Sequence, residues 1–539
     1  MFNFVFLDYL VVFLYVIILV GIIVLSSKNV KSASEFKLGG KKFGTLAIMA
    51  TQGASMKGSA SLIGYAGGAW TSGIGVLFAS QCYNMGGWVA VMIGLARRLK
   101  KSADQVNIQS LGDIFKHRYQ GDKATRVCSG LMTGWLSMAT VSGQLAAIGL
   151  LLYLATGKYG VTYVQCVSIA GVIVVACTIF GGIVSVIYTD VFQWFVMTPT
   201  IFILIPIFCI LNGATPENVH QILPKDIFFS LKPSLAWLTL LIGGLLTSVT
   251  DIVYLTRYIS AKDERTAVRG SSFGFLYTTL WAGIVIVFGL AAAVIVTPDM
   301  ITEGKDQVLY TLMGIILPPG VLGIFAAALF ATTISTIDSY LHTAVVAVTA
   351  DMKDVFYTKE FTEKQELNFV RIVTVILTLI SIFAVLKLKG IIAIFNLGWS
   401  MYASVTFAPV IATLYWKKST AVSSLLGMAF GGATFLYANF NAWKLPVIWG
   451  VGVSIISIII VALVQNKETP LLPGFQDSGK IVRGYSQDRW IFGGALVGCI
   501  GSLLVSVGVA MWFNWVIFIL GLVVMASGVK MLSIGTPTD

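Results

Sequence analysis

The chain has 539 residues, of which 57% are hydrophobic and only 11% are charged, whereas soluble domains carry about a quarter charged residues. A water-soluble core cannot absorb that much apolar surface, so the composition excludes an ordinary soluble protein and predicts a polytopic membrane protein in a lipid bilayer. The formal net charge of +12 would suit nucleic acid, but the basic residues lie in short segments between apolar stretches, so no nucleic-acid partner is expected.

Apolar stretches of about 20 residues, the length of a bilayer-crossing helix, follow one another along the whole chain. We expect about fifteen transmembrane helices in one integral domain, with no soluble catalytic module. Their approximate bounds are 6–26, 44–70, 74–97, 127–156, 160–180, 186–212, 234–259, 268–297, 314–350, 367–386, 391–416, 420–439, 443–465, 490–512 and 514–533.

The first apolar stretch begins almost at Met1, lacks a basic segment before it and has no clear small-residue cleavage site after it. Signal peptides carry both features, so we expect a retained helix. The six cysteines lie in or beside apolar stretches without CxxC spacing, which argues against a metal site or a disulfide framework.

The loops after odd-numbered apolar stretches are basic, whereas those after even-numbered stretches are poorer in basic residues, with Lys387 and Lys389 as exceptions. By the positive-inside rule, this asymmetry places the N-terminus outside and the C-terminus inside. We expect a bacterial-type inner (plasma) membrane. The basic clusters include Lys41, Lys42, Arg97, Arg98, Lys262, Arg265, Lys417 and Lys418.

The second apolar stretch is interrupted at mid-membrane depth by Gly53 and Gly58, with Lys57 between them. Irregular backbone inside the membrane is tolerated where protein or a water-filled cavity satisfies its polar groups, and in transporters such broken helices hold ions and substrate. A glycine-rich helix packed closely against its neighbours is the alternative. The lysine favours a broken helix at a functional site.

The ninth apolar stretch carries a dense polar group. Ser335, Asp338, Ser339 and His342 share one helical face, because residues three and four apart are neighbours on a helix. Thr336 lies at the edge of that face. Hard cations prefer hydroxyl, carbonyl and carboxylate oxygens, and an intramembrane aspartate is costly and usually functional. We therefore predict that Asp338 acts at a cation site, whereas His342 is a structural histidine or a proton carrier.

Two more carboxylates lie inside apolar stretches. Asp190 follows a pair of glycines near the inner start of the sixth stretch. If it faces Asp338, the two carboxylates share a cation or a proton, because two bare charges cannot lie together at low dielectric; an interfacial capping role is the alternative. Near the inner end of the seventh stretch, Asp251 and Arg257 are expected to pair or to extend toward water.

Five strings of residues carry a family resemblance. They are Ser34-Glu-Phe-Lys-Leu-Gly-Gly40, Gly181-Gly182 followed by Tyr188-Thr-Asp-Val-Phe-Gln193, Arg257 with Ala261-Lys-Asp-Glu264, Ser335-Thr-Ile-Asp-Ser339, and Phe407-Ala-Pro409 with Trp416-Lys-Lys418. Each is weak alone, but their order and spacing resemble those of the sodium:solute symporter family, which includes sodium/proline, sodium/pantothenate and sodium/sugar symporters. The resemblance covers roughly residues 5 to 465.

This resemblance implies an all-α polytopic membrane protein whose core is a five-plus-five inverted repeat, as in the leucine-transporter-like fold, with additional helices. The implied divisions are an N-terminal extra helix and inner loop at 1–43, a first repeat at 44–212, a second repeat at 213–418 and additional C-terminal helices at 419–539. The last two apolar stretches and the loop at 466–489 exceed the minimal family core.

The resemblance also implies the site residues. A main sodium site would use backbone and hydroxyl oxygens of the second and ninth stretches at Ala54, Lys57, Thr332, Ser335 and Thr336. A second cation site would use Asp190, Asp338 and Ser339. The positions available to the solute are Met56, Ser61, Gln81, Asn84, Gln144, Thr247, Asp251, Trp399 and Ser400. Sodium is the expected coupling ion, and no organic cofactor is expected.

Lys57 departs from the family pattern, which places an apolar residue beside the main sodium site. Three interpretations follow. Lys57 replaces sodium or competes with it by gaining and losing a proton, it faces the cavity and attracts a carboxylate solute, or it pairs permanently with Asp190 or Asp338. Thr247 stands where sugar-carrying relatives place a stacking aromatic residue, which favours small carboxylates and amino acids over sugars.

We therefore predict a secondary active transporter that carries a small polar organic solute with sodium by alternating access, with no obligate protein partner. A proton-coupled symporter and a transporter-fold membrane sensor are the alternatives, although the sequence offers a sensor no output domain. An enzyme is not expected, because the apolar stretches hold a single histidine, His342, and no HExxH motif. A channel would more often show repeated filter sequences.

Overall fold

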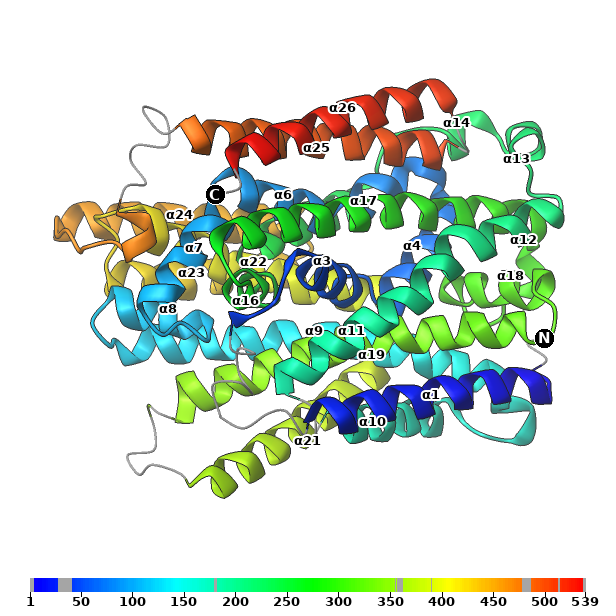
Figure 1. The fold of residues 1–539 in the computed structure, drawn as a ribbon, viewed down its shortest axis with the longest axis horizontal. Helices are drawn as coiled ribbons and strands as arrows, with labels where there is room; N and C mark the ends of the chain where they lie inside the picture. The colour runs from blue at the N-terminus through cyan, green and yellow to red at the C-terminus, as the bar shows by residue number, and fades with distance from the viewer. Residues whose placement is uncertain are drawn as a thin grey trace.

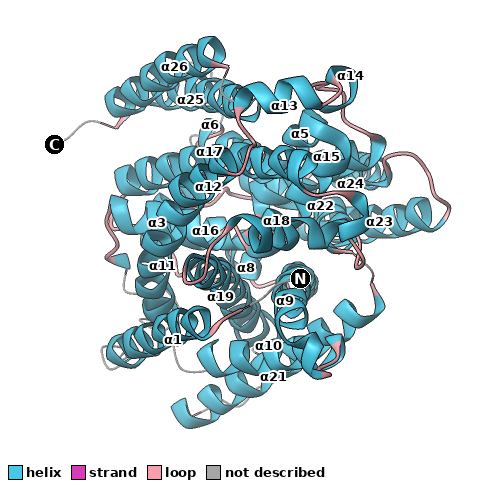
Figure 2. Ribbon diagram, turned by 90° about the vertical axis from the view of Figure 1, so that its right-hand side faces the viewer, coloured by secondary structure: helices cyan, strands magenta, loops and turns pink. Residues whose placement is uncertain are grey.

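The computed structural model describes residues 4–27, 41–178, 182–353, 355, 362–388, 390–476, 486–511 and 514–536. Within these ranges every regular element is a helix, and one isolated bridge joins Phe43 to Ala261 (Figures 1 and 2). The resemblance string at 34–40, Gly181, Lys389 and loop residues 477–485 lie outside the described residues.

The helices of the first half run from α1 to α12. They are α1 (Phe6–Ser27), α3 (Thr45–Ser55), α4 (Ser59–Ser72), α5 (Leu77–Ser80), α6 (Cys82–Met92), α7 (Leu95–Gln105), α8 (Leu111–Arg118), α9 (Lys123–Thr156), α10 (Tyr163–Thr178), α11 (Gly182–Pro199) and α12 (Ile205–Leu211). Short 3₁₀ or π segments join some of them at Gly73–Val76, Gly157–Tyr159 and Thr200–Leu204.

The second half continues from α13 to α26. Its helices are α13 (Pro216–Ile222), α14 (Lys225–Phe228), α15 (Leu235–Thr250), α16 (Ile252–Ser260), α17 (Glu264–Ile295), α18 (Val308–Ile316), α19 (Val321–Ala347), α21 (Glu363–Lys387), α22 (Ile391–Tyr415), α23 (Ala421–Phe440), α24 (Pro446–Gln465), α25 (Ser486–Ala510) and α26 (Trp515–Gly535). Short segments lie at Pro298–Met300, Lys305–Gln307, Val348–Lys353 and Pro473–Phe475.

Thirteen helical spans in the described part of the chain are long and apolar enough to cross a membrane, against the fifteen expected. The second and third predicted stretches form one apolar span, Ser59–Met92. Helix α4 nevertheless ends within this span, at its C-cap residue Gly73. Gly73 has a φ of +60°, a backbone conformation that glycine adopts without strain. In α10 the apolar part that qualifies, Tyr163–Val175, is shorter than a full span.

The first helix, α1, is fixed to the core by a buried carboxylate. Asp8 Oδ1 accepts hydrogen bonds from the backbone N–H groups of Gly320 at 2.7 Å and Gly323 at 2.8 Å. These groups lie at the start of α19, where helical N–H groups have no partner within the helix and a negative charge is favourable. The contact holds α1 along α19, the helix that carries the predicted cation site.

The last two helices, α25 and α26, form a hairpin held by closely approaching backbones. A Cβ atom on Gly528 would lie 2.3 Å from the backbone nitrogen of Gly498, and one on Gly501 would lie 2.2 Å from that of Met525. Small residues permit this close packing of membrane helices. The hairpin packs against α6 and α17 at one edge of the molecule, while α1, α10 and α21 lie at the opposite edge (Figures 1 and 2).

Candidate functional site

The predicted break in the second stretch lies between α3 and α4. Helix α3 ends at Ser55, and α4 begins at Ser59 after the extended N-cap residue Gly58. Gln144 of α9 stabilises the new start, because its Oε1 accepts from the backbone N–H of Ala60 at 3.1 Å and from Ser59 Oγ at 3.2 Å. A Cβ atom on Gly58 would lie only 2.2 Å from Gln144 Nε2, so a larger residue here would displace the Gln144 amide from the start of α4.

A second break, between α15 and α16, was not predicted. Asp251 lies at this break and its Oδ1 accepts from the backbone N–H of Val253 at 2.8 Å, which caps α16. Its Oδ2 accepts from Tyr340 of α19 at 2.7 Å. The expectation that Asp251 pairs with Arg257 or extends toward water is wrong, since Asp251 and Arg257 are both buried and the charged partner of Arg257 is Asp190.

Helix α19 contacts both sides of the break between α3 and α4. Ser339 Oγ lies 2.8 Å from Ser55 Oγ before the break. Thr333 Oγ1 lies 2.5 Å from Ser59 Oγ after it. Positions 335 and 336 of α19 lie between these two contacts along the helix.

The residues predicted for the main sodium site lie near the break between α3 and α4, but their side chains have different contacts. Thr336 lines a cavity beside the break, and its hydroxyl donates to the carbonyl of Thr332 at 2.9 Å. Ala54, in the last turn of α3, is fully buried. Ser335 donates to Asp190 Oδ1 at 2.6 Å, which links the region to the predicted second cation site.

Asp190 is the centre of a buried polar cluster. Its Oδ2 accepts from Thr51 Oγ1 at 2.5 Å and from Ser55 Oγ at 3.0 Å. Arg257 Nη2 lies 3.7 Å from the same oxygen, and it donates to Ser55 at 3.1 Å and to Ser339 at 2.6 Å. The guanidinium of Arg257 therefore supplies a positive charge beside residues that the sequence assigned to a second cation.

Asp338 and His342 are buried on α19, at 4% and 8% exposure. The sequence left open whether Asp190 faces Asp338. The partners of Asp190 include three hydroxyl groups and Arg257, so the charge of Asp190 is balanced by Arg257.

The cavity beside the break has a volume of about 30 Å³, which is room for about two water molecules. Its lining includes five of the predicted solute or ion residues besides Thr336. These are Met56, Lys57, Ser61, Gln144 and Trp399. The other lining residues are Ser55, Gly58, Tyr65, Ser80, Cys82, Tyr83, Thr140, Tyr340 and Phe395.

The remaining predicted solute residues do not line this cavity among the described residues. Gln81 donates to Ser506 of α25 at 2.6 Å and to the carbonyl of Thr279 at 3.0 Å, and Asn84 donates to Gln81 Oε1 at 2.7 Å. These amides therefore attach the C-terminal hairpin to α6 and α17.

Thr247, Ser400 and Asp251 lie behind the wall of the cavity. Thr247 donates to the carbonyl of Trp399 at 2.7 Å, and the hydroxyl of Ser400 would lie 2.6 Å from a Cβ atom on Gly243. These two residues position the link between α15 and α22, while Asp251 is covered by Tyr340.

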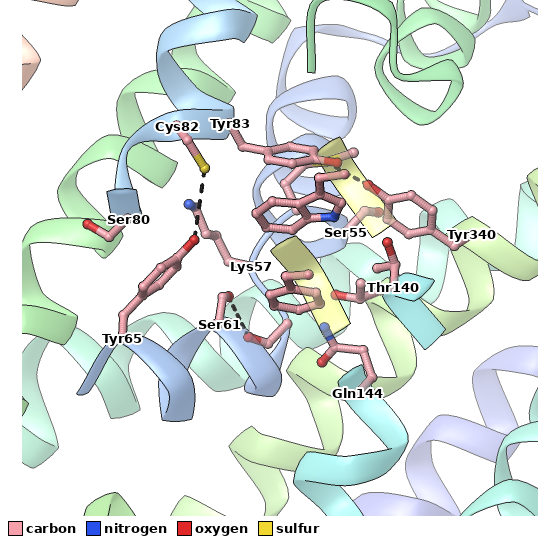
Figure 3. A pocket seen from close by; sticks show the side chains of 15 residues that line it. Ser55, Lys57, Ser61, Tyr65, Ser80, Cys82, Tyr83, Thr140, Gln144 and Tyr340 are labelled. Atoms are coloured by element: carbon pink, nitrogen blue, oxygen red, sulfur yellow. Dashed lines mark hydrogen bonds between the residues drawn. The ribbon is translucent and has the colours of Figure 1, made fainter. Parts of the chain in front are cut away.

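The side chain of Lys57 points away from α19. Its ammonium lies 5.6 Å from the centre of the Trp281 ring of α17, and Figure 3 shows it directed toward Cys82 and Tyr65. No ion pair with a carboxylate is found for it within the described residues, which argues against the interpretation that Lys57 pairs permanently with Asp190 or Asp338.

Sequence reasoning missed the aromatic wall of the cavity. Tyr83, Phe395 and Trp399 pack together, with ring centres 4.4 Å apart for Tyr83 and Trp399 and 4.5 Å apart for Phe395 and Trp399. Of these three, only Trp399 was predicted. In a chain with 65 aromatic residues by its counts of Trp, Tyr and Phe (13 + 19 + 33), sequence alone gives no signal that separates such a wall from ordinary packing.

Comparison with known families matches the sequence to one group of proteins. The profile of the sodium:solute symporter family covers residues 36–431, which is more than half of the chain. The chain belongs to the sodium:solute symporter family. As a member of this family it is an integral membrane transporter, and the resemblance read from its motifs is confirmed.

Relatives of this symporter include two with bacterial sources. The sodium/pantothenate symporter of Haemophilus influenzae is 26% identical over 452 residues, which cover 80% of this chain and 90% of the relative. The sodium/proline symporter of Escherichia coli is 23% identical and covers 80% of this chain and 87% of the relative.

Solved structures with the same fold include a sodium-coupled sialic acid symporter in a substrate-bound outward-open state. It has a TM-score of 0.71 at 19% identity and covers 86% of this chain and 99% of that chain. The nucleobase-cation-symport transporter Mhp1 in a closed conformation has a TM-score of 0.55 at 14% identity, covering 86% and 99%. These likenesses confirm the predicted all-helical, leucine-transporter-like fold.

Proposed function

We propose that this symporter carries a small polar organic solute together with sodium by alternating access, and that the solute is an amino acid or a carboxylate rather than a sugar. The observation that carries the proposal is the position of α19. Its hydroxyl groups face the break between α3 and α4, directly beside a central cavity. Relatives named for proline and pantothenate support an organic solute.

The sodium ion would bind where the interrupted backbone meets α19. The ligands would be backbone carbonyls at Ala54, Lys57 and Thr332 and the hydroxyl groups of Ser335 and Thr336. Oxygen ligands of this kind suit a hard cation. In this arrangement Ser335 and Thr336 donate their hydroxyl protons to other oxygens, which leaves oxygen lone pairs available to a cation.

We expect no sodium ion at the second cation position, because a side chain of the protein already supplies a positive charge there. Arg257 places a guanidinium 3.7 Å from Asp190 and donates to Ser339. A sodium ion added there would meet a like charge, which is unfavourable in a buried site. We therefore propose one sodium ion per solute, at the main site, with Arg257 as a fixed charge.

Sodium is favoured over a proton because of where Lys57 points. A lysine that replaces sodium would need its ammonium among the oxygens of Ser335 and Thr336. The ammonium lies instead over Trp281, on the α17 side of the cavity.

Coupling requires that sodium and solute stabilise the same state, and linkage of about 1–3 kcal/mol is typical. A cavity with room for about two water molecules must open to admit a solute, so helix movement accompanies binding. With the N-terminus outside, as the loop charges indicate, a negative potential adds about 2.3 kcal/mol per charge per 100 mV to inward release.

Uptake into liposomes that contain the purified protein tests the proposal. Labelled amino acids, carboxylates and sugars are offered under an inward sodium gradient, an inward potassium gradient and an inward proton gradient. Accumulation driven by sodium alone is expected. Accumulation driven by protons without sodium would contradict sodium coupling, and sodium-driven uptake of a sugar alone would contradict the solute class.

A further inference from the structure

The buried ammonium of Lys57 has no anionic partner in the part of the chain that the structure describes. Lys57 is 2% exposed and lines the central cavity (Figure 3). Among the described residues it has neither an ion pair nor a side-chain hydrogen bond, and its ammonium contacts the face of Trp281. A cation–π contact offsets only part of the cost of burying a charge, so the site is completed when an anion enters the cavity.

We infer that the solute is a small monocarboxylate without an ammonium group, and that Lys57 binds its carboxylate. The inference rests on the proposed function and names the substrate class within it. It goes beyond that proposal because it excludes amino acids and assigns a specificity-determining residue.

The absence of an anion in the cavity wall argues against an amino acid. None of the described lining residues is an aspartate or a glutamate. Asp251, behind the wall, already accepts from Tyr340 on one oxygen and from Val253 N–H on the other. The ammonium of an amino acid would therefore lack a carboxylate partner and would be repelled by Lys57.

A second donor faces the same cavity. Gln144 Oε1 accepts from Ala60 N–H and from Ser59 Oγ. Because a backbone N–H can only donate, this contact fixes the orientation of the amide and leaves Nε2 of Gln144 without an acceptor among the described residues. A carboxylate has two oxygens that accept hydrogen bonds, and a bond to a charged donor is among the strongest. Lys57 and Gln144 are thus separate donors on the cavity wall, and either one suits a carboxylate oxygen.

One side of the wall suits an apolar part of the solute. Tyr83, Phe395 and Trp399 form an aromatic surface on one side, and Cys82 and Tyr65 lie near the ammonium (Figure 3). A three-carbon monocarboxylate such as propionate is a suitable probe.

Three matched ligands separate the possibilities. Propionate, propionamide and alanine have the same carbon number but are an anion, a neutral amide and a zwitterion. The melting temperature of the purified full-length protein is measured with each in sodium. We expect propionate to stabilise the protein and the other two to have little effect. Lys57→Met should weaken the binding of propionate at least about 30-fold, since removing one partner of a buried charge pair has an effect of this size. Lys57→Arg, which keeps the charge, should retain part of the response.

Each contrary result identifies what fails. Equal stabilisation of Lys57→Met and wild type by propionate would overturn the role of Lys57. If alanine or propionamide raises the melting temperature more than propionate does, the solute is not an anion. The proposed function as a sodium-coupled transporter would be unaffected. If Lys57→Met does not fold, the comparison of the three ligands on wild type still decides the class.

A complete absence of response to propionate would overturn the inference. In parallel, the melting temperature without any ligand is measured in sodium and in potassium. A sodium effect without a propionate effect shows that only the substrate inference fails, whereas absence of both shows that sodium coupling fails as well.

Discussion

Arg257→Met removes the positive charge from the buried cluster around Asp190. In wild type Arg257 is 1% exposed and its Nη2 lies 3.7 Å from Asp190 Oδ2. With an effective dielectric constant of about 20, this separation corresponds to about 4 kcal/mol of attraction. That value agrees with the roughly 3–5 kcal/mol that is lost when one partner of a buried pair is removed. We therefore expect a strongly lowered melting temperature.

The same variant should acquire a new response to sodium. Asp190 keeps its three hydroxyl donors, Thr51, Ser55 and Ser335, but lacks a counter-charge, so a sodium ion can replace the guanidinium. A ligand at about 100 times its dissociation constant stabilises by about 2.7 kcal/mol. Melting is followed in sodium and in potassium. The sodium-specific gain should be larger for Arg257→Met than for wild type.

Arg269→Met is a matched control. Arg269 donates to the hydroxyl and the carbonyl of Thr536 and to the carbonyl of Ser533, and none of these acceptors is a carboxylate. Its loss should lower stability less and leave the sodium response unchanged. Wild-type melting behaviour of Arg257→Met in both salts would refute the assignment of Arg257 as a fixed cation.

Three further variants test other parts of the structure. Asp338→Asn tests the second cation site predicted from the sequence: sodium-dependent uptake should persist in the folded variant, because Asp338 is not a ligand of the single sodium site proposed above, whereas loss of uptake would return Asp338 to a cation site. Gly528→Ala should destabilise the C-terminal hairpin by about 1–3 kcal/mol through overpacking, because its Cβ atom would lie 2.3 Å from the backbone of α25. Gly452→Ala, whose Cβ atom meets nothing within 4 Å, is the control, and equal melting of the two would contradict the close packing. Gln81→Leu should lower the melting temperature but leave the KM of uptake unchanged, since Gln81 contacts Ser506; a raised KM at normal stability would return Gln81 to the solute site.

The sequence predicted the features that local patterns encode. Long apolar stretches identify the membrane class because few other structures need them, and the glycines around Lys57 identified the break between α3 and α4. The face of α19 that meets this break was also predicted, since Ser335 and Ser339 are one helical turn apart and both enter the Asp190 and Arg257 cluster.

The partners of individual polar side chains could not be predicted in this way. Arg257 reaches Asp190 across 67 positions of the chain (257 − 190), and Gln81 reaches Ser506 across 425. Nothing in the local pattern distinguishes these contacts from a solute contact. The break at Asp251 was missed for a related reason: it has no glycine, and its stabilising contacts are an N-cap and the hydroxyl of Tyr340.

Equilibrium binding of radioactive sodium to the purified protein tests the main site most directly, because it needs no knowledge of the solute. Wild type, Thr336→Ala and Lys57→Met are compared in the same buffer. We predict saturable binding of one sodium ion per chain in wild type and in Lys57→Met, and loss of that binding in Thr336→Ala. Absence of saturable binding in wild type, or equal binding in wild type and Thr336→Ala, would contradict a sodium site between the break and α19.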